Sequence, residues 1–352
     1  MASVEILSCF GRDDSTLIQK MIDDAKAAGE SVITIPRINP ETGAEGYVIG
    51  STIWLSSDTT VILDGCTMRF ADDVMCNMFA SVGAWDETFG ESEHAEQRNI
   101  RIIGKNGATF DGGNSNGKTE KTVLPGEYMV WNCFVLFRNV DGFEISGIKA
   151  VSARYWCFTF VYAKNGSIHD IEFDCRNEKP NQDGIDLRGG CNNIDIYNLR
   201  GVTGDDTVAL TNIGKNTAWW IIKGISDIDI HDVKMYNIDA GCSGGHGIIR
   251  LLAHDGRKVY NVDIKNIRDA SLDGLGKSCS AVIRVGDKNY SSVSQQLYGD
   301  ISGVTVDGVI SNSGAAVYIK HSAITSKHIT CENITAIQGE GLKLDYPDSF
   351  YE

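Results

Sequence analysis

The hydrophobic pattern of the chain begins with a helical period over residues 12–30. Five apolar residues recur at spacings of three and four and share one face of this helix: Leu17, Ile18, Met21, Ile22 and Ala25. The cap is expected at Asp13, Asp14 or Ser15, and Gly29 ends the helix. Residues 31–36 then read as a short strand, followed by a turn-rich loop over residues 36–46.

From about residue 47 onward the pattern changes to short β segments that repeat a small unit. Each unit has a turn pair rich in Asn, Asp or Gly, then two apolar residues separated by one position, and a third apolar residue shortly afterwards. Copies of the unit start at Phe143, Ile168, Ile194, Ile228, Val262, Val304 and Ile329. The shortest intervals are about 25 residues and the others are longer, which indicates a fixed core with loops of differing length.

A second short apolar segment follows most copies, at residues 184–188, 207–210, 247–250, 281–284, 316–320 and 341–344. Several short strands per repeat cannot bury one face alone, whereas stacked repeats bury a continuous core. We therefore predict an all-β fold, a single-stranded right-handed parallel β-helix with an N-terminal capping α-helix. One domain is expected over residues 1–352, with the cap in residues 1–46 and the coils in residues 47–345. A sandwich or propeller would instead show hairpin turns between strand pairs.

Composition and charge narrow the possible functions. Glycine is frequent (38 residues) and proline rare (five), which suits tight turns between short strands. A formal net charge of −15 argues against nucleic acid or an anionic membrane as partner, but it leaves an anionic substrate possible in a locally basic cleft. The ten cysteines form no CxxC motif, so we expect reduced, buried thiols and neither a metal site nor a cofactor.

The first residues show no basic segment followed by a long apolar run. This pattern predicts no signal peptide and no transmembrane span, and hence a cytoplasmic location. A secreted chain trimmed of its signal would read the same way. The oligomeric state does not follow from the sequence.

The candidate chemistry centres on three carboxylates, Asp183, Asp205 and Asp206. Equivalent positions of successive coils stack at about 4.8 Å, and we take these to be Gly184, Thr207, Gly247 and Ala281. The residues that precede them then form a column of Asp183, Asp206 and His246, flanked by Asp205. Crowded carboxyl groups cannot all ionise easily, so at least one pKa should be raised into the range of a general acid. A single such motif is usually only a turn.

Three of these motifs occur in order, and with them the chain resembles the polygalacturonase-like glycoside hydrolases of family 28. The matching segments are Asn181-Gln182-Asp183, Gly204-Asp205-Asp206 and Gly245-His246-Gly247, with further similarity at Asp13–Ser15, Ile33–Pro36, Phe110–Gly113 and Ser152–Trp156. The resemblance implies inverting hydrolysis, with Asp205 as general acid and His246 supporting its protonation. It also implies that Asp183 and Asp206 hold and deprotonate the attacking water, with carboxyl groups about 6.5–9.5 Å apart.

The chain departs from the family in its basic motif, because Arg-Ile-Lys is absent. Residues 281–286 occupy the expected coil; with Ala281 and Ile283 facing inward, Arg284 stands where the family has Lys and Val282 where it has Arg. In the family this basic pair holds the carboxylate of galacturonate. Other groups expected to compensate are Arg188, Arg250, Lys288 and Lys320, together with Tyr318 as a sugar-stacking or hydrogen-bonding residue.

Two further features bear on the substrate. Tryptophans in or beside loops are candidates either for sugar stacking or for loop packing: Trp85, Trp131, Trp156, Trp219 and Trp220. Long inserts at residues 75–95, 113–132 and 212–225 would close one end of a groove, which favours an exo-acting enzyme on short pectic-type oligosaccharides or polysaccharides. The alternatives are a β-helix polysaccharide lyase, which needs a Lys or Arg base and often Ca²⁺, and a non-catalytic carbohydrate-binding β-helix.

Overall fold

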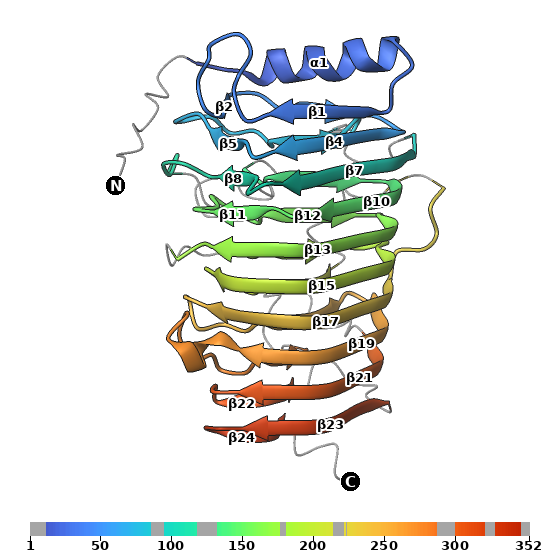
Figure 1. Ribbon diagram of the computed structural model, residues 1–352. Helices are drawn as coiled ribbons and strands as arrows, with labels where there is room; N and C mark the ends of the chain where they lie inside the picture. Colours follow the sequence, from blue (N-terminus) through green and yellow to red (C-terminus); the bar gives the residue numbers. More distant parts are fainter. Residues whose placement is uncertain are drawn as a thin grey trace.

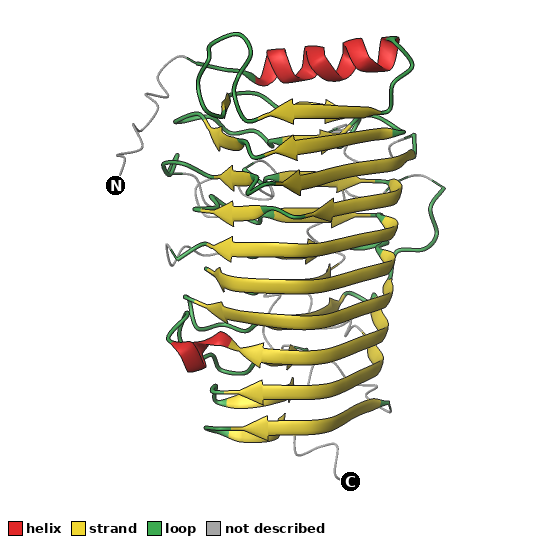
Figure 2. Cartoon of the chain, in the orientation of Figure 1, coloured by secondary structure: helices red, strands yellow, loops and turns green. Residues whose placement is uncertain are grey.

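The computed structural model describes residues 12–85, 95–117, 132–176, 181–213, 222, 224–286, 300–320 and 328–345. Parallel strands of successive coils stack into a right-handed β-helix, and one long helix, α1 (Ser15–Ala27), lies across the first coil (Figures 1 and 2). The predicted fold is therefore confirmed.

Helix α1 covers the end of the stack as the hydrophobic pattern predicts. Ile18 and Ile22 are fully buried, whereas Leu17, Met21 and Ala25 pack on the core at its edge. At the N-terminal end the Asp14 carboxylate accepts the amide of Val48 at 2.8 Å, and the Asp14 amide donates to the Val48 carbonyl at 2.7 Å. These bonds tie the helix to the first coil. Its cover protects an apolar sheet edge that would otherwise be open to pairing with another chain.

Two parallel sheets form the walls of the β-helix. The longer sheet is built from β1 (Val32–Pro36), β4 (Thr59–Asp64), β7 (Gln97–Lys105), β10 (Val140–Ser146), β13 (Lys164–Asp174), β15 (Asn192–Thr203), β17 (Ile230–Cys242), β19 (Lys258–Asp269), β21 (Asp300–Ser311) and β23 (Ile329–Ala336), with β2 (Tyr47–Ile49), β5 (Thr67–Phe70), β8 (Thr109–Asp111) and β11 (Lys149–Val151) beside them. A 3₁₀ helix, η2 (Ala270–Asp273), follows β19.

The second sheet carries the candidate site. In spatial order it contains β24 (Glu340–Asp345), β22 (Ala315–Lys320), β20 (Ile283–Val285), β18 (Ile249–His254), β16 (Val208–Ile213), β14 (Ile185–Leu187), β12 (Phe158–Val161), β9 (Val135–Arg138), β6 (Phe79–Ser81) and β3 (Ile53–Leu55). Each of these strands except the two at the ends, β24 and β3, therefore has the equivalent strands of the coils before and after it as hydrogen-bonded neighbours.

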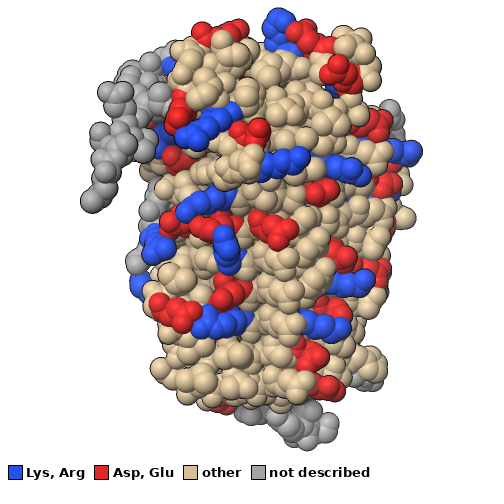
Figure 3. Space-filling view, viewed as in Figure 1, with Lys and Arg blue, Asp and Glu red and all other residues tan. Residues whose placement is uncertain are grey.

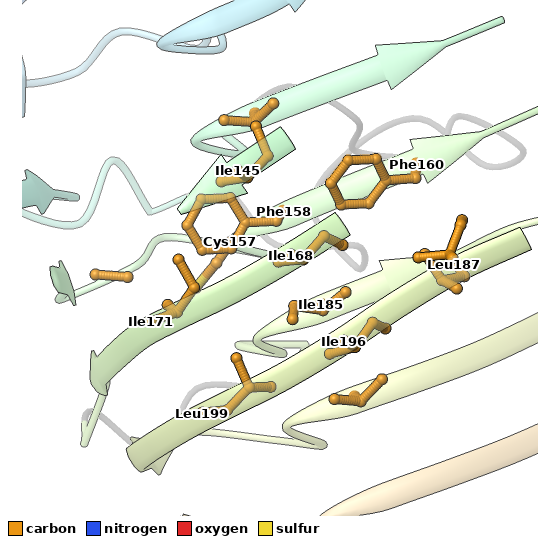
Figure 4. Close-up of a cluster of buried hydrophobic side chains, with 14 of the residues drawn as sticks. Ile145, Cys157, Phe158, Phe160, Ile168, Ile171, Ile185, Leu187, Ile196 and Leu199 are labelled. Carbon is orange, nitrogen blue, oxygen red and sulfur yellow. The ribbon is translucent and has the colours of Figure 1, made fainter. Parts of the chain in front are cut away.

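The core lies between the two sheets and consists of apolar columns that run along the stack. Ile145, Ile168 and Ile196 occupy one column on adjacent strands, and Phe158 and Ile185 approach them from the opposite sheet (Figure 4). These side chains are essentially unexposed. Each fully buried side chain of this size contributes about 1.5–3 kcal/mol, so the columns together supply the main stabilisation of the stack. Because Ile185 and Leu187 face inward, Asp186 between them faces outward.

Two of the predicted repeat starts, Ile168 and Ile228, are wrong. The position equivalent to Phe143 and Ile194 is Gly166, not Ile168. A Cβ atom at Gly166 would lie 2.1 Å from the Phe143 ring, so the large side chain of one coil replaces an apolar residue in the next. In the following coil Val233 pairs with Ile194, and Ile228 precedes β17. The apolar spacing of the unit fits both Ile228 and Val233 as its first residue, and Gly166 has no apolar side chain to mark the start of its coil.

The cysteines agree with the expectation from composition, and the face formed by the longer sheet carries charges of both signs. Acidic and basic side chains are interspersed on the face formed by the longer sheet (Figure 3), and several pair across coils, as Arg200 does with Glu172 at 2.7 Å. All cysteines in the described part of the chain are free thiols, and all of them except Cys331 are buried. Among the described residues no helix is long and apolar enough to cross a membrane.

An asparagine ladder fixes the turns along the longer sheet. The side-chain amide of Asn198 donates to the Asp170 carboxylate at 3.0 Å, and the side-chain amide of Asn237 donates to the side-chain oxygen of Asn198 at 3.2 Å. Asn266 continues the ladder by donating to Asn237 at 3.3 Å. Asn198, Asn237 and Asn266 all have φ near +55°, a left-handed conformation that Asn tolerates better than most residues. The ladder therefore satisfies side-chain polar groups and sets the direction of each turn.

We expect Asn198→Ala to lower the free energy of unfolding by about 2–4 kcal/mol, because Ala loses two hydrogen bonds and strains the left-handed backbone. Asn198→Gly loses the same bonds without the backbone strain and should cost less. Urea unfolding followed by circular dichroism measures both. Equal losses for the two variants would contradict a role for the left-handed turn.

Candidate active site

The three predicted carboxylates lie on adjacent rungs of the second sheet, in the turns that precede β14 and β16. The Gly184 amide donates to the Asp206 carbonyl at 2.9 Å, which places Asp183 and Asp206 beside each other on neighbouring coils. Asp205 adjoins Asp206, and its Oδ2 atom accepts the Asn181 amide at 3.2 Å. All three carboxylates are buried, with residue exposures of 6%, 9% and 2% for Asp183, Asp205 and Asp206. The predicted cluster is thus assembled by the stacking of the coils.

Tight backbone packing holds the turn of Asp205. The Gly204 amide donates to the Gln182 carbonyl at 3.0 Å, and a Cβ atom at Gly204 would lie 2.3 Å from the Gln182 side-chain oxygen. The Thr203 hydroxyl donates to the Asp205 carbonyl at 2.7 Å. These contacts explain why a glycine stands before the two acids, since any side chain would displace the turn of the preceding coil.

His246 lies against Asp205 and not in the column of Asp183 and Asp206, so the predicted column is wrong at its third member. The distance from His246 Nδ1 to Asp205 Oδ1 is 3.1 Å. Gly247 occupies the column instead, because its Cβ position is 3.1 Å from Asp206 Oδ1. The imidazole is half exposed and the Asp205 side chain 13% exposed, so the pair stands at the entrance to the cluster.

A one-residue shift in the ladder causes this difference. The amides of Thr207 and Val208 both donate to the Ile248 carbonyl, at 2.9 Å each. The amides of Ile248 and Ile249 likewise both donate to the Val282 carbonyl. Thr207 is therefore level with Ile248, and the predicted equivalents Gly247 and Ala281 are each one residue too early. Such a double use of one carbonyl is a local irregularity of the kind seen in β-bulges.

Cys242 joins the turns of the acid and the histidine, a contact that the sequence analysis did not identify. Its thiol donates to the Gly204 carbonyl at 3.7 Å and accepts the His246 amide at 3.3 Å. The side chain is fully buried. Cys242 thus lies between the backbone before Asp205 and the backbone of His246, which supports their mutual orientation.

Burial raises the pKa values of two carboxyl groups of the cluster, those of Asp183 and Asp206. Desolvation is the main cause at Asp183, whose pKa lies well above the usual range, and Asp186, Asp205 and Asp206 add repulsion. Desolvation also raises the pKa of Asp206 to about 6, although the Arg250 guanidinium acts in the opposite direction. One carboxylate oxygen each of Asp183, Asp205 and Asp206 is buried and accepts no hydrogen bond from the described residues, and the same is true of Asp186. These oxygens are available to bind water.

Asp186 is a fourth buried carboxylate that no sequence motif singled out. It is completely unexposed, and burial raises its pKa to about 7, against the effect of Arg188. Arg188 Nη2 lies 2.8 Å from Asp186 Oδ1, and its guanidinium lies 3.9 Å above the ring of Trp156. Trp156 itself is only 3% exposed and packs in a cluster with Leu136, Val161 and Ile222. For Trp156 the packing alternative is therefore correct.

A row of outward-facing residues, three of which are basic, runs across this coil and the following ones. Asp186, Ala209, Arg250, Arg284, Tyr318 and Lys343 occupy equivalent positions on β14, β16, β18, β20, β22 and β24. Arg250 Nη1 lies 3.6 Å from Asp206 Oδ2, and Arg284 Cδ lies 3.2 Å from the Cβ position of Gly247. Val282 is buried in the core, so the second cation beside Arg284 comes from Arg250 of the preceding coil.

Among the remaining candidates, one lies close to the site, one has a packing role, and the others fall outside the described residues. The Lys320 ammonium lies 5.1 Å from the centre of the Tyr318 ring, next to the row of basic residues. Trp85 packs edge-on against Trp54 at 5.1 Å and donates to Asn77, which is a packing role. Lys288, Trp131, Trp219 and Trp220 lie outside the described residues, as do most of the three long inserts. No cluster of His, Cys, Asp and Glu suited to a metal ion occurs within the described ranges.

Comparisons with known proteins place the chain in a family. The sequence pattern described as "Glycosyl hydrolases family 28" matches residues 33–345. A polygalacturonase of Brassica napus is 29% identical over 171 residues, which is 48% of this chain and 38% of the relative. The chain thus aligns with well under half of that relative's length.

Solved structures show the same fold at low identity. An exopolygalacturonase from Thermotoga maritima superposes with a TM-score of 0.59 at 15% identity, over 95% of this chain and 88% of the other. An endo-xylogalacturonan hydrolase from Aspergillus tubingensis gives a TM-score of 0.59 at 14% identity, over 95% and 90% of the two chains. With the family pattern matched over most of its length, the chain belongs to glycosyl hydrolase family 28.

Proposed function

We propose that the protein is an inverting glycoside hydrolase that cleaves O-glycosidic bonds of uronate-containing, pectic-type oligosaccharides or polysaccharides. The observation that carries this proposal is the cluster of Asp183, Asp205 and Asp206 on two adjacent coils, with His246 3.1 Å from Asp205. Hydrolysis with inversion needs one carboxyl group to protonate the leaving oxygen and another to activate water on the opposite face of the sugar. Family membership supports the same chemistry.

The positions of the carboxylates support a division of labour. Asp205 stands at the entrance beside His246 and is the proposed general acid, whose proton passes to the leaving oxygen. Asp183 and Asp206 lie deeper, and the oxygens that they leave without hydrogen-bond partners would hold the attacking water. Arg250 counteracts the effect of burial on Asp206, which favours Asp206 as the ionised base. The separation of about 6.5–9.5 Å between acid and base stays a prediction.

Arg250 and Arg284 support an acidic substrate. They lie on neighbouring strands of the same sheet, one and two coils after Asp206. Guanidinium groups bind carboxylates through paired, charge-assisted hydrogen bonds. In the Arg-Ile-Lys motif of the family the two cations are two positions apart on one strand, whereas here they stand on adjacent coils. Adjacent coils are about 4.8 Å apart, so the uronate carboxylate would lie along the row of outward-facing residues.

An exo mode is supported by the unequal exposure of the two sides of the site. The outward-facing side chains nearest the site on the N-terminal side are closed: Leu136, Trp156, Val161 and Tyr162 are 1%, 3%, 0% and 4% exposed. On the C-terminal side Arg284, Tyr318, Lys320 and Lys343 are partly exposed. Side chains without solvent exposure cannot line an open groove. We therefore propose that the substrate extends from the acids only toward the C-terminal coils.

Asp205→Asn should lower kcat by about 10²–10⁴-fold on hexuronic acid oligosaccharides, because the leaving oxygen loses its proton donor. Product anomers followed by NMR should show inversion in the wild-type protein. Asp195→Asn, exposed on the longer sheet, is the matched control and should retain full activity. Full activity of Asp205→Asn, retention at the anomeric carbon, or an unsaturated product absorbing in the ultraviolet would each refute the mechanism, and the last would indicate a lyase.

Arg284→Gln should raise KM for an oligosaccharide with free carboxylates by about 10–100-fold, the value of one charge-assisted contact of about 1.5–3 kcal/mol. Arg284→Lys should restore part of the loss. The methyl ester of the same oligosaccharide serves as control substrate, because it lacks the charge that Arg284 would bind. An equal effect on the free acid and on the ester would exclude recognition of the carboxylate by Arg284.

The raised pKa values also predict the pH dependence of stability. The folded-state pKa of Asp206, about 6, lies above its ordinary value of 3.8, so the folded protein binds more protons than the unfolded chain in this range. Ionisation of Asp206 therefore destabilises the fold as pH rises. We expect the stability gained by Asp206→Asn, relative to wild type, to be about 1–2 kcal/mol larger at pH 8 than at pH 5.

Urea unfolding at the two pH values tests this expectation. Asp195→Asn corrects for the general effect of removing one negative charge from an acidic protein. A gain that is the same at both pH values, or larger at pH 5, would show that Asp206 titrates without a raised pKa.

A further inference from the structure

Two cysteines meet beside the candidate site, where the chain folds back on itself. After the 3₁₀ helix η2 the backbone returns to the end of β17, and Cys242 and Lys277 form an antiparallel bridge in which the Lys277 amide donates to the Cys242 carbonyl at 2.9 Å. Glycines permit this close approach, because a Cβ atom at Gly241 or Gly276 would lie 2.0 Å or 2.8 Å from a backbone atom of the opposite segment. Cys279, two residues after Lys277, is thereby brought to Cys242.

The thiols of these two cysteines are in hydrogen-bond contact with each other. This hydrogen bond is the main cause that lowers the pKa of Cys242 below its ordinary value, and it is also the main cause that raises the pKa of Cys279. Cys242 is therefore the thiol that ionises more easily, and the Cys279 S–H group stabilises its thiolate. Because oxidants attack thiolates, Cys242 is the expected point of attack and Cys279 the expected resolving thiol.

The pair lies at the edge of the stack and not in its apolar core. Cys242 has no exposed area and Cys279 is 4% exposed, but neither belongs to the apolar columns between the sheets. Exposed residues follow each cysteine closely, at Gly244 and Ser280. The two thiols are thus nearer to solvent than the cysteines that pack inside the columns.

Cys242 also connects the turns of Asp205 and His246. Its thiol donates to the Gly204 carbonyl at 3.7 Å and accepts the His246 amide at 3.3 Å. A disulfide sulfur has no proton to donate, so the bond to the Gly204 carbonyl would be lost. Movement of the Cys242 sulfur toward Cys279 would also shift the His246 backbone. The 3.1 Å distance between His246 Nδ1 and Asp205 Oδ1 depends on that backbone position.

We propose that Cys242 and Cys279 form a reversible redox site, in which a peroxide joins the two thiols in a disulfide. The bond draws His246 away from Asp205 and lowers the rate of hydrolysis. Formation of the disulfide is independent of the proposed function, whereas its effect on hydrolysis rests on that function.

The oxidation proceeds in two steps. The Cys242 thiolate attacks one oxygen of hydrogen peroxide, the O–O bond breaks, and hydroxide leaves and takes up the proton lost by the thiol, which gives water and a sulfenic acid. The Cys279 sulfur then displaces the hydroxyl group from the Cys242 sulfur, and the Cys279 proton converts that group to a second water molecule. Two thiols are thereby oxidised to one disulfide, and one hydrogen peroxide is reduced to two molecules of water.

Peptide mapping by mass spectrometry tests whether the bond forms. After treatment of the folded protein with hydrogen peroxide, unreduced digests should contain a Cys242–Cys279 link that dithiothreitol removes. Cys157 and Cys175 are also in hydrogen-bond contact but lie inside the apolar core, so they should remain thiols and serve as the internal control. Absence of the Cys242–Cys279 link, or its formation only in unfolded protein, overturns the redox site.

The effect on hydrolysis is measured with the same samples. Oxidation should lower kcat on hexuronic acid oligosaccharides by about tenfold, the value of one hydrogen bond at the site, and dithiothreitol should restore it. Cys279→Ser, with Cys279→Ala as a second variant, should be active and insensitive to peroxide. Cys331→Ser, on β23, is the matched control and should keep the sensitivity of the wild type. Equal inactivation of the wild type and of both Cys279 variants overturns the proposal.

The NMR signals of the His246 ring separate this proposal from the proposed function, because they need no turnover. They should shift on oxidation of the wild-type protein and stay unchanged in Cys279→Ser. A disulfide that forms without moving these signals overturns the effect on the site. If the link forms and the signals shift, but no hexuronic acid oligosaccharide is hydrolysed even by the reduced protein, the redox site stands and the proposed function is overturned.

Discussion

The in-register stacking of parallel coils is the constraint on which the rest of the structure depends. Backbone hydrogen bonds between equivalent strands set the spacing of every outward side chain, whatever its charge. Asp183 and Asp206 are therefore held beside each other although desolvation and mutual repulsion oppose their ionisation. The apolar columns between the sheets supply the free energy that keeps this arrangement together. The candidate site is thus an electrostatically unfavourable part of a stack that is stabilised elsewhere.

Much of the fold follows from periodicity, because apolar spacing reports directly on burial. The helix, expected over residues 12–30 and found at Ser15–Ala27, the repeated short strands and their parallel stacking were predictable in this way. The exact register was not. Ile248, Ile249, Val282 and Ile283 are all apolar, so the pattern gives no sign that two successive amides share one carbonyl. That shift moves His246 from the column of Asp206 to the side of Asp205.

The residues of the candidate site that are recognisable by their chemical type could be predicted from the sequence. The residues whose role depends on how they are packed and buried could not. The three acids and His246 come together as expected, although in a different order around the site. Asp186 and Arg188 were harder to interpret from the sequence. Both belong to the outward face of the sheet, and only the folded structure shows that they are buried there and paired with each other. Trp156 shows the converse: an aromatic residue close to the acids serves as a support under a guanidinium group and is closed to solvent.

Gly247 has a consequence for how such a site can change. Its missing side chain leaves the space between Asp206 and Arg284, where a Cβ atom would stand 3.1 Å from one and 3.2 Å from the other. The absence of a side chain at Gly247 therefore leaves room for Asp206 and Arg284 to lie on either side of it. An alanine here would be in tight contact with both side chains, so at least one of them would have to move slightly, without any charged group being altered. A substitution at this residue, which performs no chemistry, would therefore act on the site through the positions of Asp206 and Arg284.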